Sequence, residues 1–374
     1  MIQISRPSLG PDEAQAVAEV FRTGWLGLGT VTRDFEATLE AYLGCPHVVA
    51  VNSGTSALHI ALTAFGVGAG DEVIVPSITF AACVQAILAT GATPVFCESL
   101  EETLLMDLDD AAARITPRTR AVMPVHYGGS PCDLDALFQL AAAHGFVVVE
   151  DAAHAFGSSW RGRRIGSFGH ATCFSFDPIK TLTCGEGGAV ALADPVLAED
   201  IRRRRILGID RETWTRYANA RSWSYDVTSE GFRYHLPNFC AAVGLVQFKK
   251  LESFIDRRRA ICREYDRAFQ HLTCLKIRPV DYDTVAPHLY VVRLTRGRRE
   301  TFTEALAAAG VGTGLHYIAN HVHPYFRKFA PEPLPVAERL WPSLVTLPLH
   351  CELSDADVRT VIDAVLACEE RVDH

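Results

Sequence analysis

The sequence lacks the patterns that mark several large classes of protein. It contains no CxxC pair, and no apolar run reaches the roughly 18 residues of a membrane-spanning helix. Neither GxGxxG nor GxxxxGK[ST] occurs, which argues against a nicotinamide dehydrogenase and a P-loop enzyme. The 36 Lys and Arg residues against 44 Asp and Glu give a formal net charge of -8, whereas nucleic-acid-binding proteins are usually basic. We therefore expect neither a nucleic-acid partner nor a membrane.

What remains is a globular chain. Hydrophobic residues make up 48% and charged residues 21% of the sequence, which excludes a disordered, collagen-like or coiled-coil protein. A length of 374 residues favours two domains, or one large domain with an appendage. The eleven cysteines are odd in number and scattered, and no secretory signal is present at the N-terminus. We expect a reduced, cytoplasmic protein.

Short apolar runs and amphipathic helices alternate over the first 150 residues. Short Val- and Ile-rich strands separated by helices indicate a buried, mostly parallel sheet covered on both faces, with ligands bound at the carboxyl ends of its strands. The predicted strands are 47–51, 71–76, 93–97, 120–125 and 146–151, and the predicted helices 11–22, 31–43, 57–65, 81–90 and 134–144.

The pattern changes after about residue 195. Longer helices are predicted at 197–207 and 237–256, followed by a strand at 290–294 and helices at 301–309 and 355–368. This indicates a smaller α/β domain. We place the boundary after residue 245, which gives a large domain 1–245 and a C-terminal domain 246–374. For the N-terminal segment of the large domain, packing elsewhere in the molecule is the alternative.

One candidate phosphate site follows the strand at 47–51. The run Ser53-Gly54-Thr55-Ser56 opens a helix, and a helix N-terminus offers free N–H groups, a positive dipole end and here several hydroxyls. An ordinary N-cap is the alternative.

Two other candidates also lie just beyond strands. Asp151 ends the most apolar strand, where a carboxylate is costly unless it meets a cation or several donors; a protonated pyridine nitrogen would be a fitting partner, and a helix cap is the alternative. Phe80 is placed to stack on a flat cofactor ring, or else to fill the core.

Lys180 lies between an apolar strand and the glycine-rich segment 185–188. Partial burial lowers the pKa of a lysine ammonium and makes the amine a nucleophile able to form Schiff bases. A lysine at a strand end is the structural alternative. Together, however, a phosphate cup, a stacking ring, a carboxylate for a ring nitrogen and a Schiff-base lysine are the groups that pyridoxal 5′-phosphate requires.

The chain resembles the DegT/DnrJ/EryC1/StrS family of sugar aminotransferases over essentially its whole length. The segments that carry the resemblance are 24–29 (GWLGLG), 52–59 (NSGTSALH), 150–154 (EDAAH), 175–188, 231–238 (GFRYHLPN), 312–317 (GTGLHY) and 347–350 (LPLH), of which the lysine segment 175–188 is the most specific. The resemblance implies the type I fold of pyridoxal-phosphate-dependent transferases. In that fold, a large domain with a mostly parallel seven-stranded sheet carries a smaller C-terminal α/β domain.

The resemblance also implies roles for individual residues. Lys180 would hold the cofactor and later move protons, and Asp151 would pair with the pyridinium nitrogen. The phosphate would be bound by Thr55, Ser56 and Ser175, while Phe80 stacks on the ring and His154 lies near the ring and its hydroxyl.

Family members are homodimers in which a partner residue completes each site. The matching segment here reads Arg233-Tyr234-His235 instead of the frequent Asn-Tyr-Arg. Either Arg233 or His235 is therefore expected to reach the partner's phosphate group.

The sequence indicates the substrate-binding residues less specifically than the cofactor-binding ones. His316, Tyr317, Asn320, His321 and His323 cluster in one region, for which a polar sugar lining, structural packing and a zinc site are the alternatives; the spacing does not match common zinc sites, and we predict no metal. Trp25, Leu26 and Gly27 are expected at the same cavity mouth as His316 and Tyr317. Arg221 and Arg233 are candidates for a substrate diphosphate.

The resemblance favours an aminotransferase that moves an amino group from glutamate to C-4 of a dTDP-linked 4-keto-6-deoxyhexose. The segments 232–238 and 316–321 resemble C-4-acting members more than C-3-acting ones. A C-3 sugar or cyclitol aminotransferase is the alternative on the same scaffold. A deoxysugar dehydratase would carry histidine in place of Lys180, and a non-catalytic regulator that binds pyridoxal phosphate is the alternative of another class.

Overall fold

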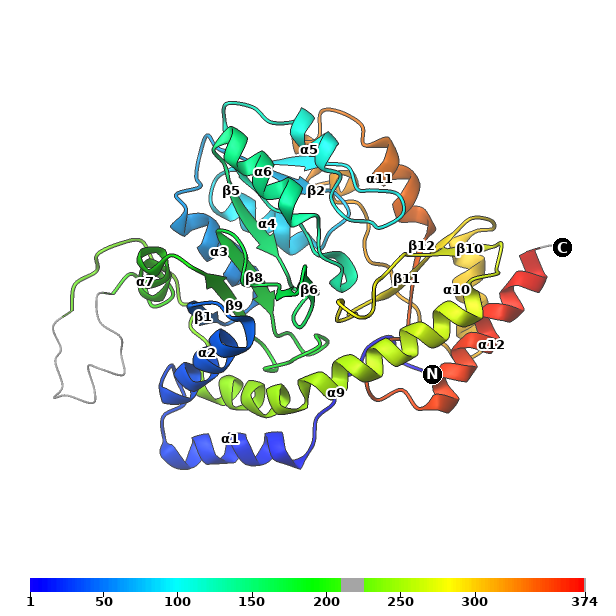
Figure 1. Ribbon diagram of the computed structural model, residues 1–374, viewed down its shortest axis with the longest axis horizontal. Coiled ribbons are helices and arrows are strands. Elements are labelled where there is room, and N and C mark those ends of the chain that lie inside the picture. Colours follow the sequence, from blue (N-terminus) through cyan, green and yellow to red (C-terminus); the bar gives the residue numbers. More distant parts are fainter. Residues whose placement is uncertain (210–224, 373–374) are drawn as a thin grey trace.

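A seven-stranded sheet forms the centre of the larger part of the molecule (Figure 1). The computed structural model describes residues 1–209 and 225–372. The strand order is β1-β9-β8-β5-β4-β2-β3, and in the described chain only β9 runs antiparallel to its neighbours. The strands are β1 (His47–Val51), β2 (Glu72–Pro76), β3 (Thr93–Cys97), β4 (Thr119–Val122), β5 (Val147–Asp151), β8 (Ala171–Ser175) and β9 (Gly188–Leu192).

Both faces of this sheet are buried, as the continuous apolar runs predict. Along β1, Val49 and Val51 belong to one hydrophobic cluster and Val48 and Ala50 to another, because successive side chains point to opposite faces. The helices α3 (Gly54–Ala64), α4 (Ala81–Ala89) and α7 (Pro195–Arg204) contribute to the first cluster, and α2 (Thr30–Leu43), α5 (Leu108–Ala113) and α6 (Leu134–His144) to the second.

A second, antiparallel sheet organises the C-terminal part. Its order is β10 (Leu275–Ile277), β11 (Tyr290–Leu294) and β12 (Leu344–Leu347), and α10 (Arg299–Ala308) and α12 (Asp355–Val372) share its core. The short helix α11 (Pro335–Leu340) instead packs on the large core. The strands β6 (Ser159–Trp160) and β7 (Arg163–Arg164) form a separate hairpin.

The long helix α9 (Asn238–Phe269) joins the two parts, with α1 (Pro11–Thr23) alongside it (Figure 1). The predicted boundary after residue 245 lies within α9, which places Leu251 in the large core and Ile261 in the small one. The N-terminal segment packs on the C-terminal part, since Ile2 pairs with Val311. No helix among the described residues has the length and apolar character needed to cross a bilayer.

The structure contains the predicted strands and helices, but two of them end elsewhere, and several further elements, among them α5, α11, β10 and β12, were not predicted. The strand predicted at 120–125 ends at Val122, and the helix predicted at 237–256 continues to Phe269. The strand at 188–192 was not predicted, because its glycine and alanines are small and carry little strand propensity. It is enclosed between β1 and β8, so tertiary pairing decides its conformation.

A buried ion pair ties α7, α2 and β1 together. Arg205 is completely buried and pairs with Glu36, and its Nη1 also donates to the carbonyl of Ala50 (2.9 Å). Glu36 in turn accepts from the backbone N–H of Ala50 (2.8 Å). Removing one member of such a pair leaves the other charge buried without compensation.

We predict that Arg205→Met lowers the free energy of unfolding by about 3–5 kcal/mol. Urea unfolding followed by tryptophan fluorescence measures this change. The matched control is Arg22→Met, since Arg22 and Glu19 pair on the exposed surface of α1 and should contribute less than about 1 kcal/mol. Equal losses of unfolding free energy in the two variants would show that the buried pair stabilises the fold no more than the exposed one.

Candidate active site

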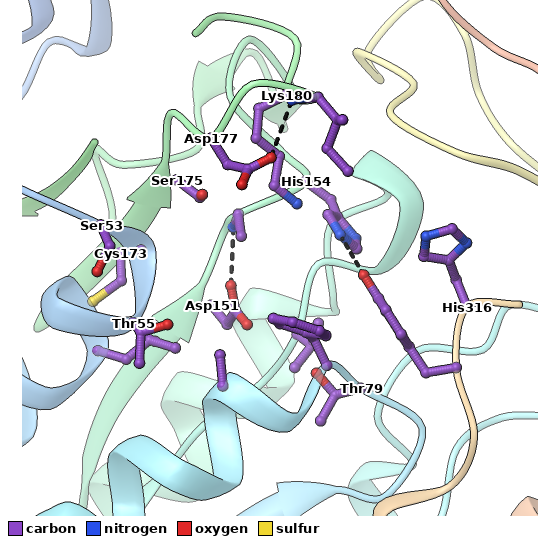
Figure 2. Close-up of a pocket in the computed structure, with 18 of the residues that line it drawn as sticks. Ser53, Thr55, Thr79, Asp151, His154, Cys173, Ser175, Asp177, Lys180 and His316 are labelled. Atoms are coloured by element: carbon purple, nitrogen blue, oxygen red, sulfur yellow. Dashed lines mark hydrogen bonds between the residues drawn. The ribbon is translucent and has the colours of Figure 1, made fainter. Parts of the chain in front are cut away.

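Four strands of the large sheet direct their carboxyl ends into one cavity of about 230 Å³ (Figure 2). The loops and helix starts that follow β1, β2, β5 and β8 supply most of its walls, and Val125 after β4 and the segment that carries His316 and Tyr317 complete them. Of the residues predicted from the sequence, those that line this cavity are Thr55, Phe80, Asp151, His154, Ser175, Lys180, His316 and Tyr317.

The first wall is the N-terminus of α3. Ser53 caps the helix by accepting from the backbone N–H of Ser56 (3.0 Å). A side chain at Gly54 would collide with Cβ of Ser175 at 2.8 Å, so glycine allows α3 and the end of β8 to approach closely. The hydroxyls of Thr55 and Ser175 line the cavity and make no hydrogen bond within the described part of the chain. Free hydroxyls at a helix N-terminus suit a phosphate group.

The second wall carries Asp151, which is buried at the end of β5. Its Oδ1 accepts from the backbone N–H of Ala153 (2.9 Å), and its Oδ2 accepts from the thiol of Cys83 (2.8 Å). Burial raises the pKa of the Cys83 thiol, which keeps it a donor. Within residues 1–209 and 225–372, Asp151 forms no ion pair. A buried carboxylate without a cation fits a site that receives a protonated ring nitrogen.

Lys180 enters the cavity from a tight turn after β8. The turn has Pro178 at its second position, and the N–H of Lys180 donates to the carbonyl of Asp177 (3.0 Å). Asp177 Oδ1 also accepts from the N–H of Ile179 (3.0 Å), a common feature of turns that begin with Asp. Burial lowers the pKa of the Lys180 ammonium to about 8, although Asp151 and Asp177 oppose the shift. The amine is thereby prepared to act as nucleophile and base.

A row of aromatic and histidine side chains closes the other side. His154 Nδ1 accepts from the N–H of Gly128 (3.3 Å), so Nε2 carries the proton toward the hydroxyl of Tyr317 (3.0 Å; Figure 2). Burial lowers the pKa of His154 well below its usual range and that of His316 to about 4, which keeps both rings neutral. His316 Nδ1 lies 2.9 Å from the hydroxyl of Thr346.

Phe80 lies at the N-cap of α4 and is 59% exposed, so it is not a core aromatic. Its ring centroid lies 5.7 Å from that of Tyr317. An uncovered ring at the edge of the cavity is suited to stack on a planar ligand. Together with the free hydroxyls, the uncompensated carboxylate and the buried amine, this arrangement fits pyridoxal phosphate.

A separate cavity of about 180 Å³ contains other predicted site residues. Trp25, Leu26 and Gly27 line it together with Arg233 and His235. None of these five lines the Lys180 cavity of the same chain. The sequence prediction that residues 25–27 share a mouth with His316 and Tyr317 therefore does not describe a single chain. Arg221 lies outside the described residues.

A family model for the DegT/DnrJ/EryC1/StrS aminotransferases matches residues 7–366. The chain belongs to this family. It is a pyridoxal-phosphate-dependent aminotransferase with the type I fold, and the alternative of a non-catalytic regulator is not retained. This family assignment agrees with the resemblance seen in the sequence.

Relatives of this aminotransferase match along nearly their full length. SpsC of Bacillus subtilis (strain 168), a spore coat polysaccharide biosynthesis protein, is 41% identical over 371 residues, which is 96% of this chain and 95% of SpsC. The solved structure of the aminotransferase TlmJ from Streptoalloteichus hindustanus is 38% identical, with a TM-score of 0.93 and 100% of both chains covered. Spr1654 from Streptococcus pneumoniae, a candidate sugar aminotransferase solved in its PMP form, is 30% identical, with a TM-score of 0.93 and the same coverage.

Several residues predicted to bind a ligand instead form hydrogen bonds within the protein. The Ser56 hydroxyl donates to Asn52 Oδ1 (2.7 Å) and does not line the Lys180 cavity. Asn320 Nδ2 donates to the carbonyl of Thr79 (2.6 Å), and His321 Nδ1 lies 2.6 Å from the Ser77 hydroxyl. These two contacts support structural packing for Asn320 and His321. Among the described residues, no group of three potential ligands is arranged for a metal ion.

Sequence reasoning missed several residues of the site. Cys83, Asp177 and Glu186 are examples, and burial raises the pKa of the Glu186 carboxyl at the cavity wall. Asp177 and Glu186 stand within the lysine segment, so their closeness to Lys180 in sequence was an available signal. Cys83 stands three residues after Phe80 on α4, and only the packing of α4 against β5 shows its contact with Asp151.

We predict that, in the cofactor-free enzyme, labelling of Lys180 by an acylating reagent has its midpoint near pH 8. Only the neutral amine reacts, so labelling rises with pH through the pKa. At pH 7 about a tenth of the Lys180 amines would be neutral, about 300-fold more than for a lysine with the ordinary pKa of 10.5. Peptide mass spectrometry measures the extent of labelling, with exposed Lys249 as internal reference. A midpoint above pH 10 would contradict the assignment.

Proposed function

We propose that this aminotransferase moves an amino group from glutamate to a nucleotide-linked keto sugar, most specifically to C-4 of a dTDP-4-keto-6-deoxyhexose. The observation that carries the chemistry is the placement of the Lys180 amine and the Asp151 carboxylate in one cavity. The names of SpsC and Spr1654 support a sugar as the substrate. The likeness of segments 232–238 and 316–321 to C-4-acting enzymes supports the position, with a C-3 sugar or a cyclitol as the alternative.

Five residues of the cavity have a part in this proposed reaction. Pyridoxal phosphate supplies an electron sink when it is bound. Thr55 and Ser175 would hold its phosphate, Phe80 would cover its ring, and Asp151 would keep its nitrogen protonated. Lys180 removes a proton from the carbon that bears the amino group and later returns one on the acceptor side.

The wall formed by His154, His316 and Tyr317 is polar but uncharged, because burial keeps both imidazoles neutral and raises the pKa of the Tyr317 hydroxyl. Neutral hydrogen-bonding groups suit the hydroxyl and keto oxygens of a sugar. The same wall leaves the glutamate carboxylates to be held by cations from elsewhere. Arg233 is one candidate for that role or for the substrate diphosphate.

We further propose a homodimer with shared sites in the cytoplasm. The second cavity presents Arg233 and His235 away from the Lys180 cavity of their own chain. His235 Nδ1 is buried there and has no partner among the described residues, although burial and the nearby Arg233 lower the pKa of this imidazole. A partner's phosphate group would use such donors. All eleven cysteines are free thiols, which supports a reducing compartment.

We predict that mixing two inactive variants restores activity if sites are shared. A Lys180→Ala subunit and an Arg233→Ala subunit would form heterodimers with one intact site each. When the two variants are denatured and refolded together, random pairing makes half of the dimers heterodimers. Because each heterodimer has one intact site of two, about one quarter of the wild-type activity should return. The His235→Ala subunit is tested in the same way. If each site were built from one chain, the mixtures would stay as inactive as their components.

The substrate is tested by incubating the purified enzyme with glutamate and a panel of keto sugar nucleotides. We expect a product mass that corresponds to replacement of the keto oxygen by an amino group, at C-4 by NMR, and only with a 4-keto sugar. Lys180→Ala is the control, and it should lose turnover entirely because its site lacks the amine. Amination at C-3, or of a cyclitol alone, would favour the alternative.

A further inference from the structure

His288 is a buried histidine that contacts the reactive lysine and that no sequence pattern identified. It lies between β10 and β11, 4% exposed, and behind the cavity rather than on its lining. Its Nε2 is 3.4 Å from Nζ of Lys180. Within residues 1–209 and 225–372, this is the one hydrogen bond that Nζ makes. The segment that follows α9 therefore contacts the reactive amine of the large domain's site from behind the cavity.

The position of the ring is fixed from several sides. The backbone N–H of His288 donates to the carbonyl of Gly128 (3.0 Å), and Arg258 donates to the His288 carbonyl (3.4 Å). The ring centroid lies 4.5 Å from that of His154. Because main chain and ring are both held, His288 cannot turn away from Lys180 without disturbing its neighbours.

The surroundings also decide which nitrogen carries the proton. His288 Nδ1 is enclosed and has no hydrogen-bond partner among the described residues. A buried N–H group without an acceptor is rarer in proteins than an acceptor whose lone pair is unused. The proton therefore belongs on Nε2, which faces Lys180. There it can donate to the lone pair of a neutral amine, whereas an ammonium group has no lone pair to accept it.

We propose that His288 is a positioning residue for Lys180 that donates a hydrogen bond from Nε2 to the lysine amine whenever this amine is not joined to the cofactor. The bond exists only with the neutral amine. It therefore keeps the amine in place and in its basic form, and its loss on protonation favours return of the proton to the reacting carbon.

The charged and titratable groups around this pair act in both directions. Asp151 and Asp177 favour the Lys180 ammonium and Arg258 disfavours it, while the nearby Cys83 stays a neutral thiol. His154 and His316 face the same amine, and burial and Lys180 lower the pKa of His288 itself, so all three imidazoles stay neutral. His288 therefore adds a hydrogen bond to the effect of burial and no charge.

Two amide variants test the proposal with similar disturbance of the packing. The amide nitrogen of His288→Gln can occupy the place of Nε2 and keep the contact with Lys180. The shorter His288→Asn reaches only the place of Nδ1 and loses it. Both are compared with the wild-type holoenzyme in a single turnover with glutamate, together with exchange of the glutamate α-hydrogen in deuterated water.

We expect His288→Asn to lower the rate constants of turnover and exchange by about 10- to 100-fold with little change in the apparent affinity for glutamate. His288→Gln should stay within a few-fold of wild type. In the cofactor-free proteins, the labelling midpoint of Lys180 should move up by about one pH unit in His288→Asn, which reduces labelling at pH 7 about tenfold. Equal rates in the three proteins would overturn the proposal. So would lower rates in both variants with an unchanged labelling midpoint, since that result indicates packing alone.

A measurement on the unmodified chain covers the case in which a variant does not fold. In cofactor-free protein with ¹⁵N-labelled histidine above about pH 9, where the Lys180 amine is mostly neutral, His288 should show a protonated Nε2 and an unprotonated Nδ1, and Lys180→Met should shift its Nε2 signal. The opposite tautomer would overturn the proposal. The inference rests on the aminotransferase chemistry and not on the proposed sugar. If wild type does not react with glutamate, the proposed donor fails while labelling and NMR still decide the role of His288.

Discussion

The site depends on holding an amine and a carboxylate out of water in one small cavity. Lys180 and Asp151 both lie at the edge of a sheet whose faces are buried, and neither forms a conventional ion pair among the described residues. The carboxylate is instead held by a backbone N–H and a thiol, and the amine by an imidazole. Burial without charge pairing makes the lysine reactive and leaves the aspartate ready for a cationic ring.

Long-range contacts fix the walls around these two groups. Asn320 and His321 attach the segment that carries His316 and Tyr317 to the loop after β2, which also presents Phe80. The hydroxyl of Tyr127 donates to the carbonyl of His316, and the hydroxyl of Tyr317 contacts His154. This side of the cavity is therefore formed in part by the C-terminal part of the chain but positioned by the large sheet. A change at Ser77 or Asn320 would act on the cavity without touching a ligand.

Four of the predicted residues that line the Lys180 cavity share a local cause. Thr55, Asp151, Ser175 and Lys180 each follow or end an apolar strand, and parallel strands bring their carboxyl ends to one edge. Ser56 was expected to bind with Thr55, but the helix turns its hydroxyl toward Asn52. Arg233 or His235 was expected to reach the partner's phosphate group and residues 25–27 the substrate, and one chain gathers all of these residues in another cavity. Sequence adjacency does not say which subunit a residue serves.

The sequence by itself determined the strand-and-helix alternation, the family and the choice of Lys180 and Asp151 as candidate site residues. These features depend on hydrophobic periodicity and on short motifs, which act over a few residues. Only the tertiary structure decided that Cys83 donates to Asp151 and that His288, 108 residues away along the chain, contacts Lys180. Such contacts form because packed elements exclude water and leave each buried polar atom to find the partner nearest in space, which is a property of the fold and not of the local sequence.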